Sequence, residues 1–398
     1  MEELISFQNN LLAQLSNNKF RYLYHHLKTS ERLLGIKGLR GTGKTTLLLQ
    51  YLAYAYPNRE KGLYVTADHP YFYTESLFGL ASQWHSYGGE LLLIDEVHKY
   101  PNWSRELKLI YDGFPKMQVL FTSSSALDLY RGESDLSRRL VTQFLHGMSF
   151  REFLNMKYDY NFDVLKLEDI LKNHSKTARQ ITSEIKVLPL FKEYLKSGYF
   201  PFANSGNPSD FSIKLLQVIN TVLETDLAFA QDYSVSNIEK IKKLLGVISV
   251  SAPFEPNVSS IAQKLQIGRN TVTSFLYHLE DAHILSLANK PNKGISHLQK
   301  PDKIYFENTN FAYSFQQSPE IGSIRETFFF NQLRNTGHRV NLSLTGDFLV
   351  DETQTFEVGG KNKTQKQITN TPNAYIAMDE TEAGIGNRIP LWIFGFLY

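Results

Sequence analysis

Residues 35–49 read GIKGLRGTGKTTLLL, and this stretch decides the fold. Its spacing Gly38-x-x-x-x-Gly43-Lys44-Thr45 matches the loop pattern in which backbone N–H groups surround phosphate oxygens. The start of the following helix adds a partial positive charge at the same place. A short apolar run precedes the loop and a leucine-rich run follows it, as a strand–loop–helix unit requires. A glycine-rich turn without a ligand is the alternative, and this context argues against it.

The residue types of the loop suit a nucleotide carrying Mg²⁺. Lys44 would reach the β- and γ-phosphates as a point charge, and the Thr45 hydroxyl would take one position in the Mg²⁺ shell. We therefore predict ATP and Mg²⁺ as cofactors. The predicted nucleotide-binding residues are Gly38, Arg40, Gly41, Thr42, Gly43, Lys44, Thr45 and Thr46.

Strand-like and helix-like stretches alternate around this loop as far as residue 146. The expected strands cover residues 32–37, 62–66, 91–95, 119–123 and 140–145. Strands separated by helices imply a parallel sheet that is covered on both faces, with ligands at the carboxyl ends of the strands. The sequence therefore predicts an α/β core of the P-loop type.

Two acids end the third expected strand, in the stretch ELLLIDE. We predict that Asp95 belongs to the Mg²⁺ shell and that Glu96 is catalytic, orienting or deprotonating the attacking water. Acids also end many strands at protein surfaces without a catalytic role. The phosphate-type loop some fifty residues earlier favours the catalytic interpretation.

The next two strands supply further candidates. QVLFTSSSA ends in hydroxyl residues, of which Ser124 is the predicted contact to the γ-phosphate or the attacking water, although serine clusters are also ordinary turn chemistry. SDLSRRLVT places Arg138 and Arg139 before the fifth strand. Arginine stabilises the charge on transferring phosphate oxygens, often from a neighbouring subunit, and we choose Arg139 for this role. A solvated arginine pair is the alternative.

Composition excludes several classes of function. The 398 residues include no cysteine, which excludes disulfides, thiolate catalysis and cysteine-type zinc sites. A net charge of +2 limits any nucleic-acid surface to a local patch. The N-terminal stretch MEELISFQNNLLAQL is acidic and amphipathic, and no apolar run approaches transmembrane length. We therefore expect a cytoplasmic protein without membrane contact.

The segments GLRGTGKTT, LLLIDEVHKYPNW, FTSSSALDL, SRRL and MSFREFL together resemble prokaryotic AAA+-type ATPases of uncharacterised role. The resemblance covers most of the chain and is strongest over the first 155 residues. It implies an ATPase core in residues 1–154, a helical lid in 155–237, a winged helix-turn-helix in 238–312 and an endonuclease-like α/β domain in 313–398. In that family a small residue precedes the arginine before the fifth strand, whereas Arg138 stands there in this chain.

The residues of the third segment also point to a helix-turn-helix. SSIAQKLQIGRNTVTSFLYHLEDAHIL has the pattern of a helix, a short turn and a second helix. The outer face of the second helix would carry Arg269, Asn270, Thr271, Thr273, Ser274 and His278, and the following hairpin would carry Lys290, Lys293, His297, Lys300 and Lys303. We predict duplex DNA contacts from Arg269, Asn270, Thr271 and Lys293. A protein-docking or structural module is the alternative.

The last segment has the acids of a metal-dependent nuclease. Glu326 begins an apolar helix, Asp347 opens a strand and Glu357 lies on the next strand. This section resembles PD-(D/E)xK nucleases, in which such acids bind Mg²⁺ and activate water for phosphodiester cleavage. Gly359 occupies the expected lysine position, so the predicted site is Glu326, Asp347, Glu357 and Lys361, with Lys363 as a second possible lysine. An inactive scaffold is equally consistent with this pattern.

Two classes of function remain. In the first, the chain hydrolyses Mg-ATP and the cycle moves C-terminal domains that face DNA or a protein partner. In the second, the nucleotide is a switch with slow or no turnover, and the nuclease-like domain is an inactive scaffold. Glu96 favours hydrolysis, because a pure binder needs no base beside Asp95. The expected partners are ATP, duplex DNA, other proteins and further copies of the chain.

Overall fold

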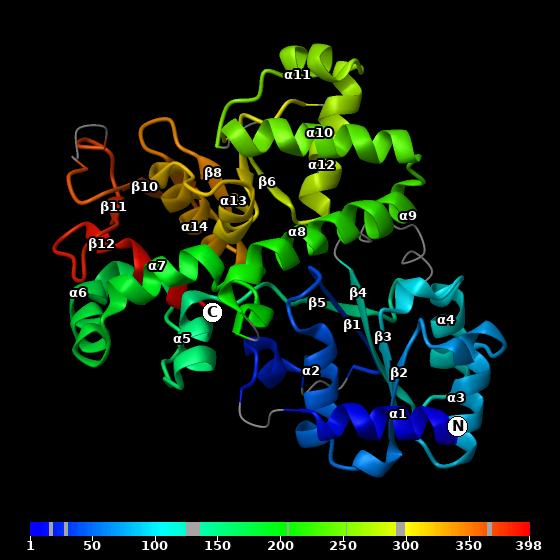
Figure 1. The fold of residues 1–398 in the computed structure, drawn as a ribbon. Helices are drawn as coiled ribbons and strands as arrows, with labels where there is room; N and C mark the ends of the chain where they lie inside the picture. Colours follow the sequence, from blue (N-terminus) through cyan, green and yellow to red (C-terminus); the bar gives the residue numbers. More distant parts are fainter. Residues whose placement is uncertain are drawn as a thin grey trace. The chain divides into compact units, whose positions relative to one another are not determined.

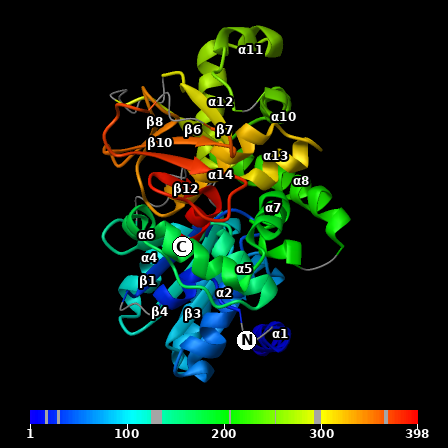
Figure 2. The ribbon, with the colours of Figure 1, turned by 90° about the vertical axis from the view of Figure 1, so that its left-hand side faces the viewer.

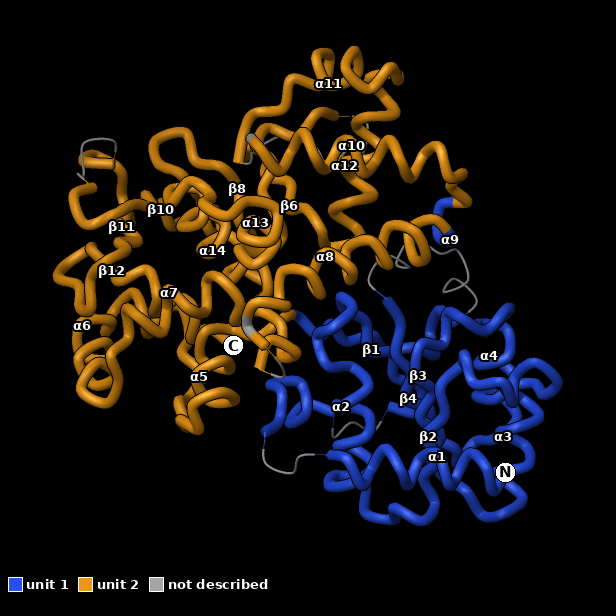
Figure 3. Tube along the Cα trace, viewed as in Figure 1, with its two compact units in different colours: residues 1–146, 229–231 blue, residues 147–228, 232–398 orange. Residues whose placement is uncertain are grey.

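The structure is a computed structural model, and its contacts divide the chain into two compact units (Figure 3). Unit 1 consists of residues 1–146 and 229–231, and unit 2 of residues 147–228 and 232–398. The residues that the structure describes are 1–15, 19–27, 31–124, 136–204, 207–251, 253–291, 299–363 and 368–398. In these residues, no helix combines the length and the apolar character needed to cross a membrane.

Unit 1 is built around a parallel sheet (Figure 1). Its strands are β1 (Leu33–Gly38), β2 (Gly62–Thr66), β3 (Leu91–Asp95), β4 (Gln118–Ser124) and β5 (Val141–Phe144). Its helices and short turns are α1 (Glu2–Ala13), η1 (Tyr22–His26), α2 (Lys44–Gln50), η2 (Tyr51–Ala55), η3 (Arg59–Lys61), η4 (Pro70–Tyr73), α3 (Leu77–Ser86), η5 (Val97–Lys99) and α4 (Trp103–Gly113). All five predicted strands are confirmed, with ends that shift by no more than one residue.

The strand order β2-β3-β4-β1-β5 determines what meets at the carboxyl edge of this sheet. β4 lies between β1 and β3, with Gly38 of β1 opposite Ser124 of β4 and Ile94 of β3 opposite Phe121. All neighbouring strands are parallel, so their carboxyl ends share one edge. The loop after β1 and the acids at the end of β3 therefore lie on either side of the end of β4.

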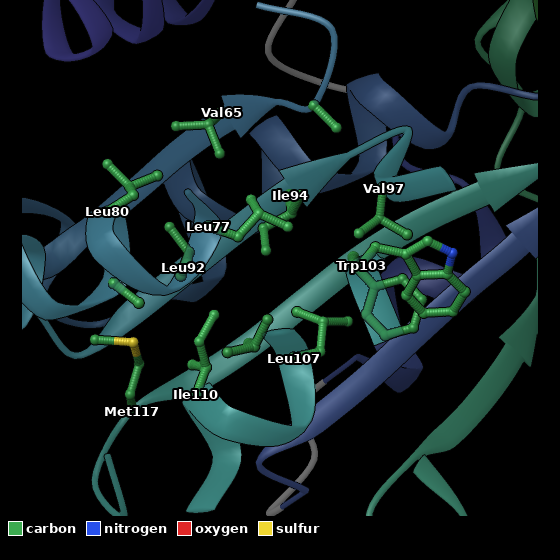
Figure 4. Close-up of a cluster of buried hydrophobic side chains, with 14 of the residues drawn as sticks. Val65, Leu77, Leu80, Leu92, Ile94, Val97, Trp103, Leu107, Ile110 and Met117 are labelled. Atoms are coloured by element: carbon green, nitrogen blue, oxygen red, sulfur yellow. The ribbon is translucent and has the colours of Figure 1, made fainter. Parts of the chain in front are cut away.

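Both faces of the sheet are covered, which explains the continuous apolar runs of β1 and β3. Alternate side chains of β3 point to opposite faces, so Leu92 and Ile94 join one buried cluster and Leu93 joins the other. Figure 4 shows the first cluster, in which side chains of α3 and α4 pack against the sheet. Each fully buried aliphatic side chain of this kind stabilises the fold by about 1.5–3 kcal/mol.

Unit 2 combines helices, a strand pair and a mixed sheet. The helices and turns after residue 146 are α5 (Phe150–Tyr158), α6 (Leu167–Glu184), α7 (Val187–Ser197), η8 (Pro201–Asn204), η9 (Pro208–Asp210), α8 (Phe211–Thr221), η10 (Val222–Leu227), α9 (Ala228–Gln231), α10 (Val235–Ser251), α11 (Val258–Leu265), α12 (Arg269–Asp281), α13 (Thr309–Phe315), α14 (Ile321–Asn335) and η11 (Leu391–Phe396). The strands are β6 (Leu285–Ala288), β7 (Lys303–Phe306), β8 (Val340–Leu342), β9 (Phe348–Val350), β10 (Gln354–Gly359), β11 (Ala374–Met378) and β12 (Arg388–Pro390).

The sheet of unit 2 has the order β12-β11-β10-β9-β8. Its pairs are antiparallel from β8 to β10 and parallel from β10 to β12, and α14 lies beside β10 (Figures 1 and 2). The antiparallel pair β6 and β7 follows the helix pair α11 and α12. The helix, turn and helix predicted for this region are present in the structure.

The first compact unit ends at His146, whereas the sequence led us to expect a first domain of residues 1–154. α5 begins with a capping box in which Ser149 and Glu152 bond each other's backbone N–H groups. Phe150 at its start packs against Phe191 and Phe396, which belong to unit 2. This aromatic contact explains why α5 belongs to unit 2 and not to unit 1.

Candidate nucleotide-binding and catalytic site

The loop between β1 and α2 has backbone geometry that favours glycine. Gly41 and Gly43 have φ angles of 84° and 94°, in the left-handed region. At Gly38 the chain is crowded, because a Cβ atom there would lie 2.4 Å from the carbonyl oxygen of Leu145. α2 begins directly after Gly43, so its N-terminus lies at the loop, and Thr45 and Thr46 are exposed there. This arrangement can hold phosphate oxygens.

Two basic side chains hold the loop from within. The Nζ atom of Lys44 donates to the carbonyl oxygens of Gly38 at 2.7 Å and Leu39 at 2.9 Å, so this buried lysine lies across the loop. The guanidinium of Arg21, which is also buried, donates to the carbonyl oxygens of Thr42 and His146. Arg21 was not predicted, since nothing in its sequence context links it to a loop some twenty residues later.

Asp95 accepts hydrogen bonds from three different elements. Thr45 of α2 donates to Oδ2 at 2.6 Å, and the Tyr64 hydroxyl of β2 donates to the same oxygen at 2.9 Å. Thr122 of β4 donates to Oδ1. Burial, and then the negative charge of Asp95, raises the pKa of Tyr64 well above its usual range, so Tyr64 stays a donor. The carboxylate is thus held in one orientation.

This arrangement fits Mg²⁺. The Thr45 hydroxyl donates a hydrogen bond to Asp95, so the lone pairs of the Thr45 oxygen remain available for a cation. The Asp95 carboxylate adds negative charge. Hydroxyl and carboxylate oxygens are the ligands that Mg²⁺ prefers, and beside a nucleotide it needs only one or two of them from the protein. Accordingly, the described residues hold no group of three or more histidine or acidic side chains arranged for a metal ion.

Glu96 lies directly beside this group in an unusual backbone conformation. Its φ of 50° and ψ of 44° are left-handed, which costs a residue with a Cβ about 1–2 kcal/mol. Its backbone N–H donates to Oγ1 of Thr122 at 2.8 Å. Thr122 therefore joins both acids, through one hydrogen bond that it donates and one that it accepts.

The carboxylate of Glu96 is paired with two cations. Its Oε1 lies 3.2 Å from Nη1 of Arg40, and its Oε2 lies 2.7 Å from Nζ of Lys99. Burial alone would raise the pKa of Glu96, but the Lys99 hydrogen bond and the Arg40 charge outweigh it and hold the pKa below its ordinary value. Glu96 is therefore ionised at neutral pH, as a residue that orients or deprotonates water must be.

The hydroxyl residues at the end of β4 lie in two different environments. Ser124, the predicted catalytic hydroxyl, lies beside Gly38 of the loop strand. Within the part of the chain that the structure describes, the buried hydroxyls of Ser123 and Ser124 have no hydrogen-bond partner. Thr122, by contrast, contacts both acids. The sequence singled out this run without distinguishing its members, and the strand order shows that Thr122 is the one in contact with both acids.

Arg139 lies toward the amino ends of the strands, opposite the carboxyl edge that carries the glycine-rich loop. It precedes β5, whose residue Val141 pairs with Leu34 at the start of β1, whereas Gly38 ends β1. At about 3.3 Å per residue, Leu34 and Gly38 are about 13 Å apart. Arg139 forms a two-bond ion pair with Asp112, at 3.0 and 3.1 Å. It therefore cannot reach a phosphate bound at its own loop.

The predicted outer face of α12 is only partly exposed. Arg269, Asn270 and Thr271 are exposed at the start of α12. Thr273, in contrast, is buried and donates to the carbonyl oxygen of Arg269 at 3.1 Å, and His278 contacts the Tyr233 hydroxyl. The expectation that these two face outward was wrong, because their side chains bond within the unit. Lys293 and His297 lie outside the described residues.

The C-terminal acids are brought together, but with a different lysine. Glu357 is fully buried, and its Oε1 lies 2.6 Å from Nζ of Lys363, whereas Lys361 is exposed. A Cβ atom at Gly359 would lie 2.7 Å from carbons of the Lys363 side chain, which fills that space. The choice of Lys361 was therefore wrong: the chain reverses after β10 and returns the later lysine to Glu357.

The other two acids of this group interact electrostatically. Burial, and then the negative charge of Glu326, raises the pKa of Asp347 to about 6. Glu326 accepts hydrogen bonds from Lys303 at 2.6 Å and from the Tyr305 hydroxyl at 2.7 Å. Lys303 is consequently paired with an acid of its own unit, which corrects its assignment to a basic DNA-facing wing.

The sequence of unit 1 matches a known family. Residues 30–154 match the family described as AAA domain, and residues 188–318 match a domain of unknown function, DUF8612. Uncharacterized protein MJ1637 of Methanocaldococcus jannaschii is 28% identical over 299 residues, which cover 69% of this chain and 62% of the relative. The chain thus spans about three fifths of the length of this curated relative.

Two solved structures with low similarity to the chain are the following. The Aeropyrum pernix ORC1 protein in complex with DNA has 12% identity and a TM-score of 0.31, covering 80% of this chain and 93% of that one. AMPPCP-bound DnaA from Aquifex aeolicus has 18% identity and a TM-score of 0.27, covering 70% and 88% respectively. Residues 30–154 thus combine a match to the AAA domain family with a parallel sheet and a glycine-rich loop.

Proposed function

We propose that the chain hydrolyses Mg-ATP at the carboxyl edge of the unit 1 sheet. The observation that carries the proposal is the hydrogen-bonded series from Thr45 through Asp95 and Thr122 to Glu96. In this proposal, Thr45 and Asp95 would bind the metal and Glu96 would be the base, and the series supports it because it connects the three residues beside the loop. A protein that only binds nucleotide has no need of the last member.

In the proposed reaction, Glu96 takes a proton from a water whose oxygen bonds to the γ-phosphorus. The bond from that phosphorus to the β–γ bridging oxygen breaks, which yields ADP and phosphate. Lys44 turns from the loop carbonyls to the phosphate oxygens, and Thr45 and Asp95 hold the cation. Bound Mg²⁺ supplies positive charge to the phosphates. Arg139 of a neighbouring copy would add charge from outside, which requires that the chain assembles.

The movement that we propose to be coupled to ATP hydrolysis involves unit 2. We propose that α11, α12 and the strand pair β6 and β7 act as a winged helix, with Arg269, Asn270 and Thr271 facing duplex DNA. The exposure of these residues at the start of a helix supports the proposal, since that is where helix-turn-helix proteins contact bases and phosphates. A protein-binding role for the same face is the alternative. A nucleotide switch with slow turnover is the alternative for the whole chain.

The test measures phosphate release by the purified chain with Mg²⁺, with EDTA, and with single-stranded or duplex DNA. Turnover that requires Mg²⁺ and is lost in Glu96→Gln supports hydrolysis at this site. Equal turnover in wild type and Glu96→Gln would contradict it. Stimulation by duplex DNA supports the coupled role, whereas turnover indifferent to DNA favours a protein partner.

A second candidate function is metal-assisted phosphodiester cleavage in unit 2. The contact between Lys363 and the buried Glu357 supports this function, because Lys363 supplies the lysine that the motif expects at position 359. Asp347 and Glu326 add two further acids whose charges act on each other. Since no three acids of the described residues form a metal-binding group by themselves, the phosphodiester would have to complete the metal shell. The test is nicking of plasmid DNA with Mg²⁺ or Mn²⁺. Loss of nicking in Lys363→Ala but not in Lys361→Ala supports it, and no nicking by wild type supports a scaffold.

A further inference from the structure

Each carboxylate oxygen of Glu96 is held by a cation from a different element. Arg40, in the glycine-rich loop, lies 3.2 Å from Oε1, and Lys99, at the end of η5, lies 2.7 Å from Oε2. The Arg40 and Lys99 side chains are 17% and 30% exposed, so both contacts are partly shielded from water. Partly shielded ion pairs are weakened less by solvent than exposed ones.

The two cations belong to different parts of the site. Lys99 also contacts Oδ2 of Asp68, and the other oxygen of Asp68 accepts a hydrogen bond from Thr66 at the end of β2. Lys99 therefore bridges two carboxylates and is tied to a second strand end. Arg40 belongs instead to the segment that would surround the phosphates of a nucleotide.

A bound nucleotide would compete with Glu96 for Arg40. A triphosphate carries more negative charge than one carboxylate, and guanidinium groups bind phosphate oxygens in a two-bond geometry. The Arg40 side chain starts within the loop, so it lies on the segment that a bound phosphate would contact. Lys99 is on η5, outside the loop, and its two carboxylate contacts do not involve a loop residue.

We propose that Glu96 is positioned by one fixed cation and one exchangeable cation. Lys99, held by Asp68, keeps Oε2 in place throughout, whereas Arg40 leaves Oε1 for the phosphates when a nucleotide binds. Oε1 then becomes open to the attacking water only in the presence of substrate. This inference rests on the proposed hydrolysis at Glu96. Lys99 is a positioning residue, because it acts only through Glu96, whereas Arg40 would also contact the phosphates.

The exchange by Arg40 is tested by a double-mutant cycle on nucleotide binding. Affinity for Mg-AMPPCP is measured by calorimetry for wild type, Glu96→Gln, Arg40→Ala and the double variant. Because Glu96 competes for Arg40, Glu96→Gln should tighten binding about fivefold when Arg40 is present and less than about 1.5-fold when it is absent. Equal tightening in both backgrounds would overturn the exchange, since it would reflect charge repulsion alone.

The fixed role of Lys99 is tested by turnover. Lys99→Met should lower kcat about tenfold or more and change KM less than about twofold, because a displaced catalytic group costs rate rather than affinity. Lys99→Arg should restore most of the rate, since a guanidinium can still bridge both carboxylates. Lys61→Met is the matched control, because it breaks an exposed ion pair with Glu90 in the same unit and should leave turnover unchanged.

The outcomes separate this inference from the proposed function. An unchanged kcat in Lys99→Met, or a loss that Lys99→Arg does not restore, would overturn the fixed role of Lys99. If wild type shows no turnover with any divalent cation, hydrolysis fails, yet Arg40-dependent tightening in the binding cycle still supports the exchange. Turnover by wild type without that tightening rejects the exchange and leaves hydrolysis standing.

Discussion

Thr45 donates a 2.6 Å hydrogen bond to Asp95, and this bond joins two motifs that are 50 residues apart in the chain. The hydroxyl that would bind Mg²⁺ and the carboxylate that would balance its charge are therefore in contact before any ligand arrives. A site held in this way loses little conformational freedom on binding. The predictions below test how its individual residues contribute.

The first prediction separates binding from chemistry. Lys44→Ala should weaken Mg-ATP binding about 10- to 100-fold, because a charge-assisted contact to the phosphates is lost. Glu96→Gln should bind at least as tightly as wild type and slow hydrolysis about 100-fold or more, because it removes the base and not a phosphate contact. Calorimetry and phosphate release measure the two effects. Weak binding by Glu96→Gln would contradict the division of roles.

The second prediction concerns the arginine at the far edge of the sheet. Arg139→Ala should lower kcat about 100-fold or more with little change in affinity, since a residue supplied by another copy acts on the transition state. Mixing Arg139→Ala with Lys44→Ala should restore part of the activity, because each variant provides what the other lacks. Arg138→Ala is the matched control. Full activity in a monomeric preparation would exclude a contribution from a neighbour.

The third prediction tests the residue behind the metal ligand. Tyr64→Phe removes the 2.9 Å hydrogen bond to Asp95 and should raise the Mg²⁺ concentration for half-maximal turnover about tenfold. Excess Mg²⁺ should restore the rate, because no group that touches the nucleotide has changed. Tyr51→Phe, another buried tyrosine of unit 1, should behave as wild type. An unchanged Mg²⁺ requirement in Tyr64→Phe would show that the bond is only structural.

The fourth prediction concerns duplex DNA. Replacing Arg269 and Lys293 together should weaken binding and make the logarithmic salt slope shallower by about one unit per lost phosphate contact. Fluorescence anisotropy across a series of salt concentrations measures both quantities. Lys172→Ala, an exposed lysine of α6, is the control for a general loss of charge. No binding of wild type at low salt would assign the face to protein or to structure.

The fifth prediction uses the acid pair of unit 2. Since the folded-state pKa of Asp347 is raised to about 6 from a usual 3.8, folding favours its protonated form. This favourable contribution is present below the unfolded pKa and is lost as the pH rises through 6. Asp347→Asn should therefore stabilise the chain by about 2 kcal/mol at pH 8 and much less at pH 4. Denaturant unfolding at both pH values measures the difference, and equal effects would contradict the raised pKa.

The sequence predicted those parts of the site that depend on local spacing. The loop from Gly38 to Thr45, the strand that ends in Asp95 and the parallel sheet all follow from short-range pattern. Thr122 and Tyr64 could not be chosen in this way, because their contacts with Asp95 depend on which strands are neighbours. Nothing in the order of residues along the chain specifies that β4 lies between β1 and β3.

Long-range geometry also explains the remaining differences. Lys363 reaches Glu357 only because the chain reverses after Gly359, and a motif with fixed spacing does not describe a reversal. Thr273 and His278 have residue types that suit DNA, yet their hydrogen bonds within unit 2 hold them inward. For such residues, the packing partners decide the role and not the side-chain chemistry alone.

The close approach of Lys363 to Gly359 has a consequence for how the chain can change. Because a Cβ atom at position 359 would meet the Lys363 side chain at 2.7 Å, a side chain at position 359 requires Lys363 to move. Gly359→Lys alone should therefore disturb the pocket, even though it introduces the residue that the motif expects. Its effect should reverse in sign once Lys363 is shortened. The effect of a substitution at position 359 therefore depends on the residue at position 363. To move the lysine from 363 to 359, Lys363 would have to be shortened first and Gly359 replaced second.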